Sequence, residues 1–317
     1  MGSYYGIDGD TLQRQYKDHL SNFKDWNQKS HSKKWLLFPD NIGEFLSLDE
    51  TEMSNGELYT ILTNKAAKGR KGAIVAMVLG TKSKDIISII NKIPLLIRNN
   101  VKEVTVDMAN NMNLVVKSCF LQADTVVDRF HVQKLAAEAV QDIRIKFRWE
   151  AIDNENQEIQ KSKDENYSYT PELLSNGDTL KQLLARSRYL LFKPETRWTN
   201  SQLSRSKILF DRYPKIEQAY ILSQKLSFIY ENNIHKNTAR TKLAHWYKEV
   251  EESGFKAFNT VAKSIFHHYD NILNYFNNRS TNASAESFNA KLKRFRTEFR
   301  GVRDLEFFLF RLTNIFA

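Results

Sequence analysis

The chain has 317 residues, of which 41% are hydrophobic, 12% aromatic and 26% charged, and this balance excludes an intrinsically disordered protein. The longest apolar run, residues 73–79, is far shorter than the roughly 20 residues that span a bilayer, so we expect a cytoplasmic protein. A formal net charge of +10 favours a polyanionic partner such as nucleic acid, and the single cysteine, Cys119, excludes a thiolate zinc cluster.

The first predicted strand comes after an N-terminal arm, residues 1–43, in which aromatic and basic side chains are scattered without a clear period. The strand is predicted over Glu44–Thr51, where apolar residues precede two acids, Asp49 and Glu50. Solvated loop acids are the plain alternative for such a pair. The same arrangement recurs in a second predicted strand, Val101–Met108, which carries Asp107 near its end.

Two further strands are predicted between these, over Leu58–Thr63 and Ala73–Leu79, and they complete an antiparallel meander. A basic loop joins them. Its side chains can contact phosphate, or they can form an ordinary charged hairpin tip, and the candidate residues are Lys65, Lys68, Arg70 and Lys71.

Helices alternate with strands in the next part of the chain. Ser83 is a predicted N-cap for a helix whose isoleucines recur at helical spacing, and this helix leads to the Asp107 strand. A helix over Met112–Phe120 then leads to a strand over Ala123–Val127, after which Asp128 stands. An amphipathic helix follows that strand.

This order of elements predicts an α/β fold with a mixed sheet of three antiparallel strands plus two parallel ones. It matches the ribonuclease H-like fold. In that fold the first and fourth strands are neighbours about 4.8 Å apart, so Asp49 and Asp107 are expected side by side. The catalytic core is then divided in the sequence, into residues 44–143 and residues 281–317.

A large all-helical insertion is predicted over residues 144–280, because no strand pattern is convincing there. Its polar tract, residues 153–170, is either a linker or an exposed helix end. Trp198 can stack on an unpaired base, although a half-buried packing role is the more ordinary one.

The last 37 residues are predicted to form two closing helices, the first capped by Asn282 and carrying Glu286 in its first turn. Compensation of the helix dipole is the plain role for this acid. The same helix presents polar residues at helical spacing, and we list them as candidates for DNA contact: Asn289, Lys293 and Arg296.

Three carboxylates from distant parts of the chain can hold two hard divalent cations through oxygen ligands, and Mg²⁺ suits such a site. Two ions about 3.5–4 Å apart serve phosphodiester chemistry in many enzymes.

Three stretches of the sequence resemble the catalytic region of ISL3-type insertion-sequence DDE transposases. They are VTVDMANNM with Asp107, ADTVVDRFHVQKL with Asp128, and TNASAESFNAKLKRFR with Glu286. The resemblance implies metal-dependent DNA cleavage and strand transfer in bacteria. It also implies that catalysis and the binding of two Mg²⁺ ions, for which Mn²⁺ can substitute, depend on Asp49, Asp107 and Glu286.

The DRFH signature supplies accessory candidates next to this triad: Asp128, Arg129 and His131. A structural hydrogen-bonded histidine and a helix-capping aspartate are the alternatives. Because the chain has no cysteine-rich zinc module or helix-turn-helix, we expect nonspecific phosphate contacts and a separately encoded recognition protein. We also expect a homo-oligomer and an association with the nucleoid. A catalytically inactive DNA-binding protein and a structure-selective nuclease of the same fold remain open.

Overall fold

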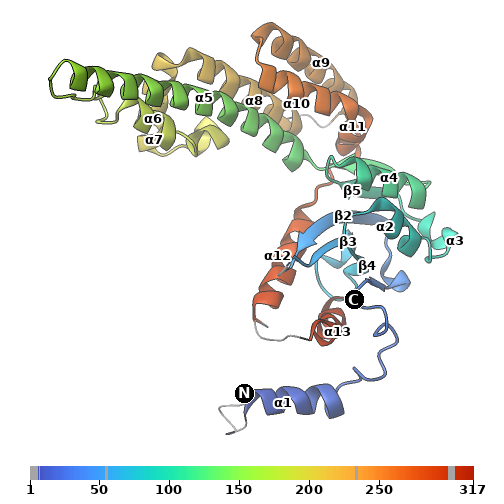
Figure 1. The fold of residues 1–317 in the computed structure, drawn as a ribbon. Coiled ribbons are helices and arrows are strands. Elements are labelled where there is room, and N and C mark those ends of the chain that lie inside the picture. Colours follow the sequence, from blue (N-terminus) through green and yellow to red (C-terminus); the bar gives the residue numbers. More distant parts are fainter. Residues whose placement is uncertain (1–5, 7, 54–55, 233–234, 299–303) are drawn as a thin grey trace. The chain divides into compact units, whose positions relative to one another are not determined.

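The computed structural model describes residues 6, 8–53, 56–232, 235–298 and 304–317 (Figure 1). The chain divides into two compact units, which we call the sheet unit, Met1–Asp128 with Ser280–Ala317, and the helical unit, Arg129–Arg279. None of the described helices is long and apolar enough to cross a membrane.

The sheet unit contains a six-stranded mixed sheet with the order β1-β4-β3-β2-β5-β6. From β1 through β2 each strand is antiparallel to its neighbour, whereas β2, β5 and β6 run parallel to one another. The strands are β1 (Trp35–Leu37), β2 (Phe45–Glu52), β3 (Leu58–Asn64), β4 (Ile74–Leu79), β5 (Glu103–Val106) and β6 (Asp124–Val127). The α/β class and the mixed sheet are therefore confirmed.

The predicted number of strands was one too few, because β1 lies within the polar arm. Only three residues long, it shows no extended alternating pattern and is held by its pairing with β4. The arm also forms α1 (Gly9–Gln15) and a π-helix, η2 (Tyr16–Leu20).

The helices of the sheet unit flank the strands (Figure 1). The prediction of Ser83 as an N-cap was wrong: Ser83 is the first helical residue and Lys82 is the N-cap, without a side-chain cap bond. The remaining helices are η3 (Pro39–Asn41), η4 (Lys65–Ala67), α2 (Ser83–Ile90), α3 (Leu95–Arg98), α4 (Asn110–Cys119), α12 (Ala283–Glu298) and α13 (Leu305–Phe316).

The two faces of the sheet bury different side chains of β2, because successive residues of a strand point to opposite faces. Leu46 and Leu48 belong to the core shared with α2 and α4. The opposite face packs against α12 and α13, through a core that includes Phe288 and Leu292. Asp49, one residue beyond Leu48, is therefore on the α12 face.

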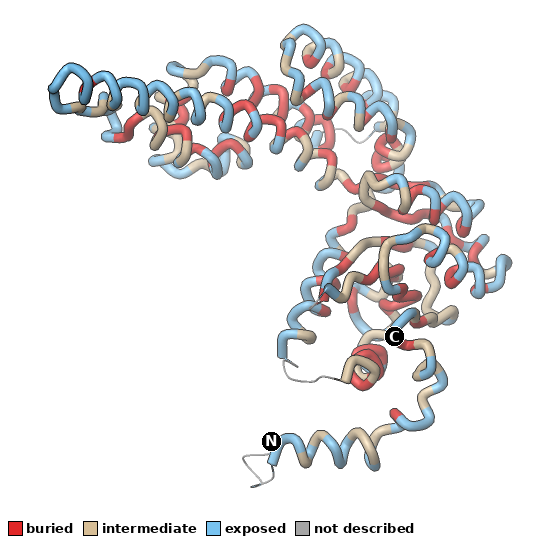
Figure 2. The backbone as a smooth tube through the Cα atoms, viewed as in Figure 1, coloured by how far each residue is buried: buried red, intermediate tan, exposed pale blue. Residues whose placement is uncertain are grey.

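The helical unit contains no strand among its described residues. Its polar tract does not form a linker: α5 continues through it to Asp164, and Figure 2 shows that this distal half of α5 is mostly exposed. The helices are α5 (Arg129–Asp164), α6 (Leu180–Arg186), η5 (Leu190–Phe192), η6 (Glu195–Arg197), α7 (Asn200–Arg212), α8 (Pro214–Asn232), α9 (Lys236–Ser253), α10 (Lys256–His267) and α11 (Tyr269–Asn278).

Candidate active site

Three aspartates follow the paired segments of three neighbouring parallel strands. Ser47 of β2 pairs with Thr105 of β5, which pairs with Val126 of β6. Asp49, Asp107 and Asp128 each stand two residues after one of these three paired residues. Partners in a parallel pair share a face, so the register places all three acids on the side of the sheet that α12 covers.

Hydrogen bonds orient the first two of these carboxylates. The amide of Asn289, on α12, donates to Asp49 Oδ2 at 2.7 Å, and the backbone N–H of Glu50 donates to Oδ1 at 2.9 Å. Asp49 lies inside β2, not at its end, because the strand continues to Glu52. The backbone N–H of Ala109 donates to Asp107 Oδ1 at 2.8 Å.

Asp128 is only 2% exposed, and its Oδ1 has no hydrogen-bond partner within the described part of the chain. A buried carboxylate oxygen without a partner carries a desolvation cost that a cation can offset. Such an oxygen donor suits a hard divalent ion.

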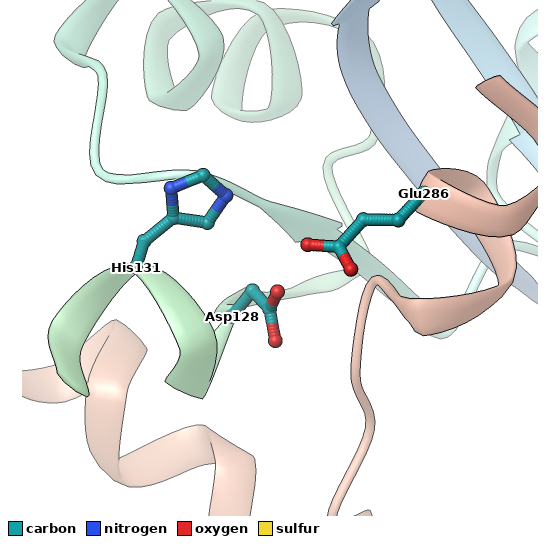
Figure 3. A group of neighbouring side chains, drawn as sticks. All are labelled: Asp128, His131 and Glu286. Atoms are coloured by element: carbon teal, nitrogen blue, oxygen red, sulfur yellow. The ribbon is translucent and has the colours of Figure 1, made fainter. Parts of the chain in front are cut away.

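Glu286 is exposed in the first turn of α12, and its carboxylate lies near that of Asp128 (Figure 3). Asp128, Glu286 and His131 can each offer one ligand atom, and these atoms lie within 4.8 Å of one another. His131 follows Asp128 by three residues, in the first turn of α5. The donors around Asp128 thus fit a divalent metal.

Lys65 provides a largely buried positive charge on this face of the sheet. Its ammonium lies 3.1 Å from Glu103 Oε1 and also bonds Thr105 Oγ1. Burial lowers the pKa of Lys65, while the charges of Glu103 and Asp128 oppose that shift. Lys65 therefore offsets part of the negative charge behind the row of aspartates.

Glu50 is a neighbour of the site to which the sequence analysis assigned no role. Burial raises the pKa of its carboxyl group, a hydrogen bond from Asn111 lowers it, and the charge of Asp107 raises it further. Strict alternation after Leu48 is the sequence signal that could have placed Glu50 on the α4 face.

Comparisons with known proteins show the family to which the chain belongs. The family model for ISL3-type DDE transposases, described as "Transposase", matches residues 46–312. The chain belongs to this family. It is also similar to the transposase for insertion sequence element IS1001 of Bordetella parapertussis, with 23% identity over 275 residues, which are 86% of this chain and 61% of that protein. The chain thus spans less than two thirds of this relative, and no solved structure matches.

The basic residues predicted to contact DNA differ in their exposure and in their partners. Lys65 is turned inward, whereas the other cations of its loop are exposed. On α12, Lys293 is exposed, but Arg296 lies 3.1 Å from Glu57 and its guanidinium lies over the Phe308 ring. The exposed loop cations are Lys68, Arg70 and Lys71.

Trp198 and Asn282, two other side chains with predicted roles, are at least partly enclosed by the protein itself. Trp198 donates its Nε1–H to the carbonyl of Leu190 at 2.8 Å and packs against Phe210 and Tyr220, as expected of a packing residue. The prediction that the Asn282 side chain caps α12 was wrong, since both its polar atoms are buried without a partner among the described residues.

The Asn289–Asp49 hydrogen bond leads to a prediction about positioning. Asn289→Ala should lower DNA cleavage by roughly 10- to 100-fold, the usual effect of losing a group that orients a metal ligand. Asn289→Asp should lower it more, because it places a second negative charge beside Asp49. Single-turnover cleavage rates over a range of Mg²⁺ concentrations test this, and unchanged rates in both variants would show that the bond is dispensable.

Proposed function

We propose that the chain is a DDE transposase that cuts DNA at the ends of an insertion sequence and transfers the cut strand to target DNA. Asp49, Asp107 and Glu286 are its catalytic residues, carried on a ribonuclease H-like sheet. The main support for the proposal is the register of β2, β5 and β6, in which Asp49, Asp107 and Asp128 each stand two residues beyond the paired residues Ser47, Thr105 and Val126. Glu286, on α12, has a ligand atom within 4.8 Å of one of Asp128.

In this proposal the triad holds two Mg²⁺ ions, for which Mn²⁺ can substitute, and Asp128 is an additional oxygen ligand. Such ions, when bound, polarise a phosphodiester and help to deprotonate an attacking water or 3′-hydroxyl. Mg²⁺ prefers oxygen ligands, which the row of aspartates supplies, and the unpartnered Asp128 oxygen supports the assignment.

The surrounding residues hold these acids in place in the proposal. Asn289 ties α12 to β2 and so sets the position of Glu286, one helical turn away, relative to Asp49. The backbone N–H of Ala109 fixes the orientation of Asp107. Lys65 limits the repulsion among the acids through its ion pair with Glu103.

The partners in this proposal are the ends of the insertion sequence and the target DNA, which place the protein at the nucleoid. Because two ends must be cut and joined together, we propose a homo-oligomer in which each copy binds one end. Selection of the ends by a separately encoded recognition protein also belongs to the proposal.

The experiment is to incubate the purified chain with Mg²⁺ and DNA that carries the element's own ends. We expect strand cleavage at the ends and joined products, both abolished by EDTA. Cleavage without joining would favour the nuclease of the same fold, and Mg²⁺-independent binding without cleavage would favour a DNA-binding protein.

A further inference from the structure

An arginine on α5 of the helical unit is buried without an acidic partner among the residues that the structure describes. Arg144 is 5% exposed; its Nε donates to Gln141 Oε1 at 2.7 Å, and its Nη1 donates to the carbonyl of Leu184 at 2.8 Å. Both acceptors are neutral. A buried charge that is hydrogen-bonded but not paired retains a substantial desolvation cost.

Two more arginines lie near it. Burial lowers the pKa of Arg144, and the charges of Arg148 and Arg188 lower it further. The segment after α6 is fixed beside α5 because Gln141 Nε2 donates to the carbonyl of Arg188 at 3.2 Å. We call Arg144, Arg148 and Arg188 the arginine cluster.

Two members of the arginine cluster are exposed to solvent, above the buried Arg144. Arg148 and Arg188 are exposed, and the Arg188 guanidinium lies 5.6 Å from the centre of the exposed Tyr189 ring. In the portion of the chain that the structure describes, no carboxylate forms an ion pair with any member of the cluster. Arg186, close by in sequence, differs because it pairs with the buried Asp178.

We propose that the arginine cluster is a binding site for the phosphate backbone of duplex DNA. The planar guanidinium forks of Arg148 and Arg188 can each donate two hydrogen bonds to one phosphate, and Arg144 adds positive charge from beneath. A duplex is favoured over an acidic protein because the whole chain carries a net charge of +10 and the cluster contains no residue that selects a carboxylate over a phosphate. The inference depends on the proposed function only in taking DNA as the substrate.

The test compares the full-length protein with its Arg148→Gln/Arg188→Gln variant by fluorescence anisotropy, using a labelled duplex of random sequence in EDTA. We expect roughly tenfold weaker binding near physiological salt, because two phosphate contacts are lost. The slope of log K against log salt should become shallower by up to about 1.8, since each neutralised phosphate contributes about 0.9.

The matched control is Arg240→Gln/Lys248→Gln, which removes two exposed cations from α9 of the same unit. It should bind almost as the unaltered protein does. Arg148→Lys/Arg188→Lys should retain most of the binding, since it keeps both charges. Equal losses in the cluster variant and the α9 control, or no loss in either, would overturn the proposal.

A second measurement needs no variant. Phenylglyoxal modifies exposed arginines, so mass spectrometry of the unaltered protein should find Arg148 and Arg188 protected when duplex is bound, and Arg240 still modified. Equal modification of the two cluster residues with and without DNA would also overturn the proposal. Cluster-dependent binding by a protein that never cleaves would refute the proposed function alone, whereas cleavage with cluster-independent binding would refute this inference alone.

Discussion

Asp49→Asn, Asp107→Asn and Glu286→Gln are each expected to lower DNA cleavage by roughly a thousandfold or more, since metal ligation supplies several kcal/mol of transition-state stabilisation. Each substitution keeps the volume of the side chain and removes the charge that a cation needs. Glu286 is exposed and the two aspartates are only half-buried, so the fold should survive. Single-turnover cleavage of end-containing DNA is the measurement, with far-ultraviolet circular dichroism to verify folding.

The matched control for these variants is Glu52→Gln, because Glu52 is an exposed acid at the end of the strand that carries Asp49. It should cleave at the rate of the unaltered protein. Near-normal cleavage by any one triad variant would remove that residue from the catalytic set. Asp128→Asn belongs in the same series, because loss of cleavage there would add Asp128 to the set.

Magnesium is expected to stabilise the unaltered protein against thermal unfolding. A ligand that binds only the folded state at 100 times its dissociation constant contributes about 2.7 kcal/mol, which raises the melting temperature by several degrees. We expect the aligned acids to bind the ion only in the folded state, because only folding brings their charges together. Differential scanning fluorimetry with MgCl₂, and with NaCl at equal ionic strength, measures the effect.

The melting temperatures of two triad variants should depend much less on magnesium. Without a divalent ion, Asp49→Asn and Asp107→Asn should melt at a higher temperature than the unaltered protein, because like charges on adjacent strands repel one another. With MgCl₂ their gain should be small. An equal magnesium-dependent shift in the unaltered protein and in both variants would show that the ion stabilises the fold from another place.

The sequence predicted the strands of the site well and their exact ends less well. The apolar positions of β2 and β5 recur at a period of two and are followed by an acid, which is a local signal. That Asp49 lies inside β2 depends on β3, which pairs with β2 as far as Glu52. Pairing between distant segments is not written in either segment alone.

Side-chain partners were less predictable than strands. Lys65 belongs to a run of cations that resembles a phosphate-binding loop, yet it turns inward because Glu103 is buried on β5. Only the register reveals that acid as a partner. Asn289 seemed part of a DNA-facing helix surface, but the burial of its neighbour Phe288 against the sheet turns Asn289 toward Asp49.

The sequence left the end of α5 open for a different reason. Its distal half has few apolar residues, so no periodic stripe marks it as a helix. Glutamate, glutamine and lysine nevertheless have high helix propensity, and the Glu155–Lys181 ion pair at 2.7 Å links this half to α6. Intrinsic propensity thus extends a helix that apolar patterning alone would have ended early.

The position of a bound metal tests the proposed metal site most directly. Crystals of the protein grown with Mn²⁺ and end-containing DNA, measured at the manganese absorption edge, give anomalous peaks that locate the ions. We expect manganese bound by the carboxylates of Asp49 and Asp107, with Glu286 as a further ligand. Manganese bound elsewhere, with Asp49 and Asp107 making no contact to any ion, would contradict it.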